Sequence, residues 1–282
     1  MRQGTRYNLF LAHQPGRLSS VDLMREEVFL YPISDRNGSQ AAPRVLIVGL
    51  GALGCPAAET LADSGCVDLT LVDDDRVELS NLQRQTLFHR QDAERATPKA
   101  LAAEQALSGH GRTRRFEGIV DRVTAKNVAH LVSENDFVID ACDNPATKLL
   151  LNRACVAAGT PLAYGGVVRT GGQTMTIIPG RSACLECAFP ALAEDAETDD
   201  GDSCSRMGIL APVAGVIGSL QAVAALETLS GRSDGGEMQI YDLTATHWRT
   251  IRFERDPACE TCGQVASATD SDTARRLPTC PM

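Results

Sequence analysis

The chain has few aromatic residues, no excess of basic residues and no long uninterrupted apolar run. Phe, Trp and Tyr make up 4% of its 282 residues, which leaves few rings for stacking against single-stranded nucleic acid. The formal net charge is −9, whereas nucleic-acid-binding proteins present a basic face to phosphates. No apolar run reaches the length of about 18 residues that a membrane span needs. These features argue against a nucleic-acid partner and against a membrane partner.

The first residues lack the apolar segment of a signal peptide, so we expect a cytoplasmic protein with reduced thiols. The five histidines share no spacing, with one another or with an acid, that would indicate a triad or a metal site. Hydrophobic residues make up 43% of the sequence, which is enough for one large α/β domain or two small ones.

Residues 45–75 have the pattern of a nucleotide-binding βαβ unit. The apolar run 45–48 predicts a buried parallel strand, and it leads into the sequence GLGALG. A helical spacing of small residues follows, and then a second predicted strand, 68–72, which ends at Asp73. A glycine motif in this context predicts a nucleotide site, although a glycine turn that only packs a helix on a sheet would have the same letters.

Each glycine of the motif has its own physical reason. Gly49 permits a tight turn, and Gly51 lets the backbone approach a phosphate because it has no Cβ. Gly54 allows the helix to pack closely on the strand, and the start of this helix presents free N–H groups to an anion. Asp73 is placed to accept hydrogen bonds from ribose hydroxyls.

Charged and amide residues follow the second strand: Asp75, Asn81, Arg84, Gln85 and Lys99. Arg84 is suited to fork onto phosphate oxygens, and Lys99 adds a point charge. A nucleoside triphosphate needs such a grip, whereas a nicotinamide cofactor does not. Either cation alone would be interpreted as a solvated surface residue.

Residues 137–141 predict a further strand, and the sequence ACDN places Asp143 at the carboxyl edge of the sheet. At this edge Asp143 is a candidate magnesium ligand, and a turn carboxylate is the alternative. Asn144 is predicted to open a helix over 145–158 that Gly159 closes. A second helix is predicted over 124–132, with Thr124 as its cap.

Four of the ten cysteines form two CxxC pairs: Cys184, Cys187, Cys259 and Cys262. Two such pairs predict a tetrahedral zinc site, which is structural because four thiolates leave no open position. A redox pair is the alternative. Three other cysteines sit among apolar neighbours and are predicted to be small core residues: Cys66, Cys142 and Cys155.

The alternation of strands and helices over 45–143 predicts a Rossmann-like α/β fold, with a doubly wound, mostly parallel sheet. Strands predicted over 162–169 and 174–178 suit an antiparallel C-terminal extension, with Gly165-Gly166 and Gly171-Gly172 as breakers. Residues 210–229 predict a helix rich in small residues, in which Gly215 and Gly218 permit close packing inside the protein or at a dimer interface.

The motifs GLGALG, SNLQRQ, PK and ACDN and the two CxxC pairs, in this order, resemble the ThiF/MoeB family. Its members adenylate ubiquitin-like sulfur-carrier proteins. The resemblance covers about 44–263, so residues 1–43 are predicted to be an N-terminal arm and linker, and 264–282 a disordered polar tail. It implies that the C-terminal glycine carboxylate of a Gly-Gly carrier attacks MgATP. A separate sulfur donor or sulfurtransferase then makes the thiocarboxylate.

The resemblance also assigns roles to residues. It implies that Arg84 and Lys99 bind phosphates and that Asp143 binds magnesium. The other residues expected to contact the nucleotide are Gly49, Gly51, Gly54, Asp73, Asp75, Asn81, Gln85 and Asn144.

Cys204 takes the place of the family's loop cysteine, which is either covalently reactive or a spectator. The family is homodimeric, and an arm arginine, here Arg6 or Arg25, reaches the partner's nucleotide. Two other functions compete with adenylation: an NAD-dependent oxidoreductase, and a non-catalytic carrier-binding scaffold.

Overall fold

A computed structural model describes residues 42–108, 114–192 and 208–265 of the chain. All of them belong to the second of two units, Ile33–Met282, the first being Met1–Pro32. Arg6, Arg25, Cys204 and the tail from residue 266 lie outside the described residues.

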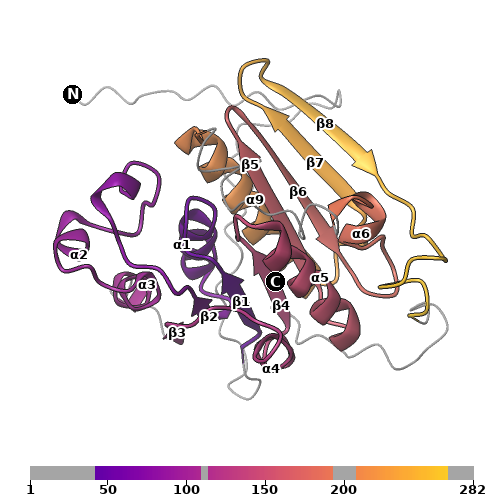
Figure 1. The fold of residues 1–282 in the computed structure, drawn as a ribbon, viewed down its shortest axis with the longest axis horizontal. Coiled ribbons are helices and arrows are strands. Elements are labelled where there is room, and N and C mark those ends of the chain that lie inside the picture. Colours follow the sequence, from indigo (N-terminus) through magenta and orange to yellow (C-terminus); the bar gives the residue numbers. More distant parts are fainter. Residues whose placement is uncertain (1–41, 109–113, 193–207, 266–282) are drawn as a thin grey trace, which may run out of the picture. The chain divides into compact units, whose positions relative to one another are not determined.

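One sheet of eight strands organises the unit (Figure 1). Its strands are β1 (Arg44–Val48), β2 (Asp68–Val72), β3 (Phe116–Ile119), β4 (Phe137–Asp140), β5 (Leu162–Val168), β6 (Gly171–Ile177), β7 (Glu237–Asp242) and β8 (His247–Arg252). Their order is β3-β2-β1-β4-β5-β6-β7-β8. Pairing is parallel from β3 to β5 and antiparallel from β5 to β8. This confirms the predicted doubly wound sheet with its antiparallel extension.

Two of the helices, α5 (Pro145–Ala158) and α9 (Ala211–Leu229), cover opposite faces of the sheet. The other helical segments are α1 (Gly54–Ser64), the 3-10 turn η2 (Leu79–Asn81), α2 (Arg90–Glu94), α3 (Lys99–Ser108), α4 (Val128–Ser133) and α6 (Leu185–Ala188). On β5, the Tyr164 ring contacts Lys148 of α5, whereas the neighbouring Gly165 packs against Gln221 of α9. Because adjacent strand residues face opposite ways, α5 and α9 lie on opposite faces, as Figure 1 shows.

Helix α5 has the ends that its sequence predicts. The Asn144 side chain accepts a hydrogen bond from the Thr147 N–H at 2.8 Å, and Pro145 occupies the first turn. Gly159 ends the helix in the left-handed conformation, with φ of 72°. The interpretation of Thr124 as a cap was wrong, because α4 begins at Val128 after Asn127. The Asn127 side chain holds a turn by accepting from the Thr124 N–H at 2.8 Å.

Helix α9 packs along α1, β5 and β6. By length and composition it is long and apolar enough to cross a membrane, but 56% of its most apolar window is buried inside the protein. A Cβ on Gly218 would lie 2.3 Å from the Leu53 carbonyl oxygen, whereas one on Gly215 would meet no described atom within 4 Å. Of the two predicted close approaches, the described residues confirm only that of Gly218.

The glycines of the antiparallel strands are not breakers, so that prediction was wrong. Gly165 and Gly166 pair with Thr174 and Gln173 inside the ladder, and the glycines of β6 are paired as well. A Cβ on Gly165 would lie 2.5 Å from the Gln221 side chain, and one on Gly172 at the same distance from Ile217. These glycines are needed because α9 lies so close to the sheet.

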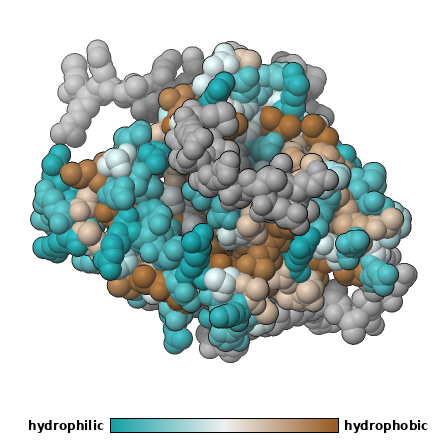
Figure 2. All heavy atoms as spheres, viewed as in Figure 1, coloured by the Kyte–Doolittle hydropathy of each residue, from teal (hydrophilic) through white to brown (hydrophobic). Residues whose placement is uncertain are grey.

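The surface around α2 and α3 is predominantly hydrophilic, as Figure 2 shows at the left of the view. None of the five residues of α2 is buried, whereas α3 buries Lys99, Ala100, Ala102, Ala103 and Leu107. Helix α3 packs against β3 and β2.

Candidate functional site

A pocket of about 780 Å³ opens at the carboxyl ends of the parallel strands, where open α/β sheets bind ligands. It brings together ten of the predicted nucleotide-contacting residues, namely Gly49, Gly51, Asp73, Asp75, Asn81, Arg84, Gln85, Lys99, Asp143 and Asn144. Gly54 does not line it, and instead lies beneath the loop. The predicted residues thus converge on one cavity from four segments that are far apart in sequence.

The three glycines of the loop differ in the space around them: Gly49 and Gly54 are tightly packed, whereas Gly51 is open. Gly49 has φ of +90°, and a Cβ there would lie 2.7 Å from the Ala141 carbonyl oxygen. A Cβ on Gly54 would lie 1.9 Å from the Gly49 carbonyl oxygen, so only glycine fits. A Cβ on Gly51 would meet no described atom within 4 Å. Gly51 therefore borders open pocket space beside the start of α1, which has no side-chain cap.

Asp73 is tied to this loop. Its Oδ2 accepts from the Leu50 N–H at 2.6 Å, and its Oδ1 accepts from the Asp75 N–H at 2.8 Å. Burial raises the pKa of Asp73 above its ordinary value, against the opposing effects of Lys99 and of the two N–H groups. Each carboxylate oxygen can accept one more hydrogen bond, so a role toward ribose hydroxyls is compatible with this geometry.

Two cations reach the pocket from different directions. Lys99, at the start of α3, is 5% exposed, and its Nζ donates to Asp75 Oδ2 at 2.7 Å. Arg84 donates from one guanidinium nitrogen to Asn81 Oδ1 at 2.7 Å. Both cations are held by a neighbour before any ligand arrives.

Three further predicted residues differ in exposure. Asp143 is exposed at the pocket's edge, where it is accessible to a cation. The neighbouring Asn144 lines the pocket and caps α5. Gln85 is buried, and its Oε1 has no partner among the described residues, so its amide is a candidate for a ligand or a water.

A buried ion pair beneath the pocket escaped the sequence analysis. Lys148 Nζ lies 3.2 Å from both carboxylate oxygens of Asp140 and donates to the Gly165 carbonyl oxygen at 2.7 Å. Burial alone would lower the pKa of Lys148, but Asp140, Tyr164 and Cys142 together outweigh it and raise the pKa, so the lysine stays charged. The sequence contained one signal of this buried lysine, since Lys148 directly precedes the apolar run Leu149-Leu150-Leu151.

Other contacts also differ from the sequence analysis. Asp121, Arg122 and Val123 line the pocket after β3 and were not singled out. Cys66 and Cys155 are buried as expected, but Cys142 is half-buried and lines the pocket. Cys142 also packs against the buried core, so the prediction of a core residue is confirmed only in part: the chain leaves β4 at Asp140 and turns toward the cavity.

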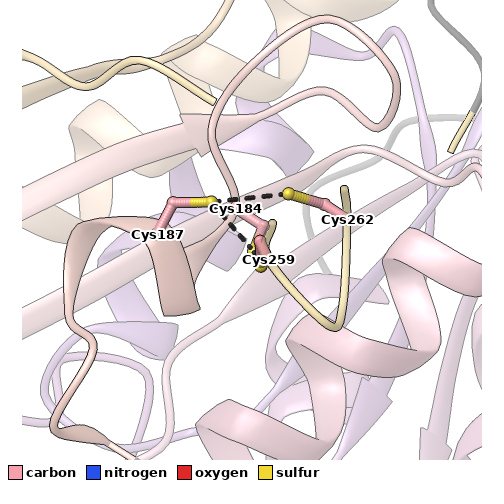
Figure 3. A group of neighbouring side chains, drawn as sticks. All are labelled: Cys184, Cys187, Cys259 and Cys262. Atoms are coloured by element: carbon pink, nitrogen blue, oxygen red, sulfur yellow. Dashed lines mark hydrogen bonds between the residues drawn. The ribbon is translucent and has the colours of Figure 1, made fainter. Parts of the chain in front are cut away.

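The four paired cysteines meet away from this pocket (Figure 3). Their sulfurs lie within 4.8 Å of one another, and three pairs are 3.4, 3.7 and 3.9 Å apart. A tetrahedral zinc with Zn–S bonds of about 2.3 Å separates its sulfurs by about 3.8 Å. Gly263 closes the second turn, because a Cβ there would lie 2.4 Å from the Pro257 carbonyl oxygen. The donor set and its spacing fit zinc.

Comparison with known proteins identifies relatives of this chain. The ThiF family matches residues 36–261. The sulfur carrier protein ThiS adenylyltransferase of Escherichia coli K12 is 39% identical over 222 residues, which are 78% of this chain and 86% of that protein. The molybdopterin-synthase adenylyltransferase of the same strain is 39% identical over 235 residues, or 82% and 92% of the two chains.

Among solved structures, E. coli MccB with MccA-N7isoASN has the same fold, with a TM-score of 0.68 at 22% identity. The match covers 78% of this chain and 67% of that one. The family match extends over most of the sequence, and both adenylyltransferases exceed 30% identity along most of their own length. The chain therefore belongs to the ThiF family.

Proposed function

We propose that this protein is an ATP-dependent adenylyltransferase that activates the C-terminal glycine carboxylate of a ubiquitin-like sulfur-carrier protein. One observation carries the proposal: a glycine loop open to a ligand shares its pocket with Arg84, Lys99 and Asp143. The relatives of this ThiF-family chain named above are adenylyltransferases of a sulfur carrier and of molybdopterin synthase.

The chemistry needs no base from the protein, because a carboxylate is already a nucleophile at neutral pH. A carboxylate oxygen of the carrier forms a bond to the α-phosphorus of ATP. The bond from that phosphorus to the bridging oxygen breaks, and pyrophosphate leaves with the electron pair. Catalysis is then positioning and charge stabilisation, in which Arg84 and Lys99 hold the phosphates and Asn81 orients Arg84.

The other pocket residues bind the nucleotide in this proposal. Gly51 and the start of α1 face the phosphates, with Gly49 and Gly54 fixing the loop. Asp73 accepts from the ribose, and its bond to the Leu50 N–H sets the distance between ribose and phosphate sites. Asp75, Gln85 and Asn144 are the remaining nucleotide-contacting residues that line the pocket.

The charges of the pocket favour a divalent cation with the nucleotide. Six carboxylates line the cavity (Asp73, Asp74, Asp75, Glu78, Asp121 and Asp143), against four cations (Arg84, Lys99, Arg122 and Lys148). Lys99 and Lys148 are already paired with carboxylates. A triphosphate adds negative charge to this excess, and bound magnesium would neutralise part of it. The exposed carboxylate of Asp143 is the proposed magnesium ligand.

The four-cysteine cluster is proposed to hold a structural zinc ion, which would tie the turn around α6 to the segment after β8. The proposal also includes a homodimer, a separate sulfur donor or sulfurtransferase, and a cytoplasmic location. Cys204 is proposed to act, if at all, after adenylation, since that step needs no thiol.

The decisive experiment is ATP–pyrophosphate exchange with a panel of candidate carriers ending in Gly-Gly. Exchange that depends on one carrier supports the proposal and names the pathway. A folded protein that binds carrier but gives no exchange with any of them is the scaffold alternative. Binding of NAD in preference to ATP, compared by thermal shift, would favour the oxidoreductase alternative.

A further inference from the structure

Helix α5 carries a buried polar face that runs from the nucleotide pocket to the four-cysteine cluster. Lys148 is 8% exposed, and Asn152 is fully buried. The two residues are four positions apart, so they lie above one another on the same helical face, separated by about 6 Å along the axis. Lys148 thus lines the nucleotide pocket and Asn152 contacts the segment of the cysteine cluster, from two successive turns of one helix.

At the pocket end, α5 holds the loop that carries the proposed magnesium ligand. Lys148 binds Asp140, and Asp140 Oδ1 accepts from the Cys142 N–H at 3.0 Å. Asn144 begins the helix through its bond to Thr147. The loop with Asp143 is therefore fixed to α5 on both sides, and a shift of the helix would move it.

At the other end, α5 holds the cysteine cluster through Asn152 and Glu186. Asn152 Oδ1 accepts from the Leu185 N–H at 2.9 Å, and its Nδ2 donates to Glu186 Oε1 at 3.1 Å. Glu186 stands between Cys184 and Cys187 and also accepts from the Thr261 hydroxyl, which stands between Cys259 and Cys262. One carboxylate thus joins both cysteine turns to the helix.

The cluster has a second support that does not involve Glu186. Arg255 donates from Nε to the Cys262 carbonyl oxygen at 3.1 Å and from another nitrogen to the Gly263 carbonyl oxygen at 3.2 Å. We therefore expect the second cysteine turn to keep its shape when Glu186 is replaced. This makes the connection to α5 separable from the assembly of the cluster.

We propose that Asn152 and Glu186 are positioning residues that couple the zinc site to the nucleotide pocket through α5. The inference rests on the proposed function, since it takes zinc and MgATP as the two ligands. Zinc fixes the Cys184–Cys187 turn and with it the partners of Asn152, which set the position of α5 and of Asp143. Because coupling between binding free energies is reciprocal, bound MgATP must raise the affinity for zinc by the same factor by which zinc raises the affinity for MgATP.

The test measures both directions on the full-length zinc protein. Zinc affinity is measured by equilibrium competition with a chromophoric chelator, with and without saturating MgATP, and MgATP affinity is measured by calorimetry. The variants are Glu186→Ala, Glu186→Gln, which keeps one acceptor oxygen, and Glu237→Ala. Glu237 is the matched control, since its carboxylate pairs with Arg252 on exposed parts of β7 and β8.

In the wild type, MgATP is expected to raise the affinity for zinc by about five-fold or more, the lower end of typical site coupling. Glu186→Ala should abolish this effect and weaken MgATP binding while zinc remains bound at the start. Glu186→Gln should restore part of the effect, and Glu237→Ala should match the wild type. If Glu186→Ala fails to fold, the Gln variant and the wild-type measurement decide.

A zinc affinity that is the same with and without MgATP, in a wild type that binds MgATP, would overturn the coupling and leave the proposed function intact. Retention of the full effect in folded Glu186→Ala would overturn the roles of these two residues. A wild type that binds no MgATP would overturn the proposed function, and one that holds no zinc would overturn the proposed zinc site; either result would overturn the coupling as well.

Discussion

Arg84 donates to the side-chain oxygen of Asn81 across 2.7 Å, three residues earlier in the chain. A second, longer bond of 3.4 Å reaches the Ser80 carbonyl oxygen. The guanidinium is thereby held at the pocket wall before any phosphate arrives, which reduces the entropy lost on binding.

Replacing Arg84 by alanine should abolish ATP–pyrophosphate exchange while the fold survives. The loss of one stabiliser of transition-state charge is expected to cost about 10²–10³-fold in rate. Arg84→Lys should not restore the rate, because a lysine lacks the planar fork. Asn81→Ala keeps the guanidinium and should have a smaller effect. Near-normal exchange in a folded Arg84→Ala protein would show that Arg84 does not bind the phosphates.

Lys99 and Asp75 form a second held pair, in which the lysine side chain is 6% exposed and the aspartate side chain 67%. Lys99→Met keeps the length of the buried side chain and removes its charge, so exchange should fall by about 10²–10³-fold with little change in thermal stability. Equal exchange rates in Lys99→Met and wild type would exclude Lys99 from the site.

Asp75→Asn, in contrast, should strengthen the binding of metal-free ATP. One carboxylate leaves the acidic wall, and Lys99 is released toward the phosphates. Because Asp75 is largely exposed and screened, the expected gain in affinity is about five-fold, measured by calorimetry in the presence of chelator. Weaker binding would show that Asp75 orients Lys99 rather than competing with phosphate for it.

The parts of the fold that could be predicted are those encoded locally. The glycine loop, the caps of α5 and the parallel strands depend on residues within a few positions of one another. The predicted pocket residues converge because parallel strands bring their carboxyl ends to one edge, which follows from topology alone.

The parts that could not be predicted depend on distant partners. Gly165 was interpreted as a breaker because nothing nearby in sequence reveals that Gln221 will pack against it. Lys148 and Asp140 belong to different elements, and their contact follows from how α5 folds back on β4. Close backbone approach and buried ion pairs depend on tertiary structure. In the local sequence they are visible only as a glycine or a lysine whose role is not explained by its neighbours.

Purified, untagged protein should contain about one zinc per chain, as a closed four-thiolate site implies. Elemental analysis of Cys184→Ser/Cys187→Ser should find the zinc lost, since half of the ligand set is gone, and unfolding should begin at lower temperature. Cys66→Ser, outside the cluster, is the control and should keep its zinc. Stoichiometric zinc in the double variant would refute the ligand set.

The protein should be a homodimer in solution, as its resemblance to ThiF/MoeB enzymes implies. Light scattering at micromolar concentration measures this directly, and a monomer under these conditions would count against an arm arginine acting across the dimer. Mixing Arg84→Ala chains with chains changed at Arg6 or Arg25 extends the test. Such mixtures should recover exchange only if an arginine of one chain completes the partner's pocket.

The two glycines of α9 should respond to alanine in opposite ways. Gly218→Ala places a methyl group against the Leu53 carbonyl oxygen, and this overpacking is expected to lower the free energy of unfolding by about 1–3 kcal/mol. The strain falls on Leu53, which precedes Gly54, so nucleotide affinity should fall as well.

Gly215→Ala meets open space on the same helix and should be neutral, or stabilising by up to about 1 kcal/mol through helix propensity. Thermal unfolding of both variants beside the wild type checks the pair. A loss of stability in Gly215→Ala that grows with protein concentration would mean that Gly215 lies in the dimer interface. A loss independent of concentration would contradict the packing of α9 described above.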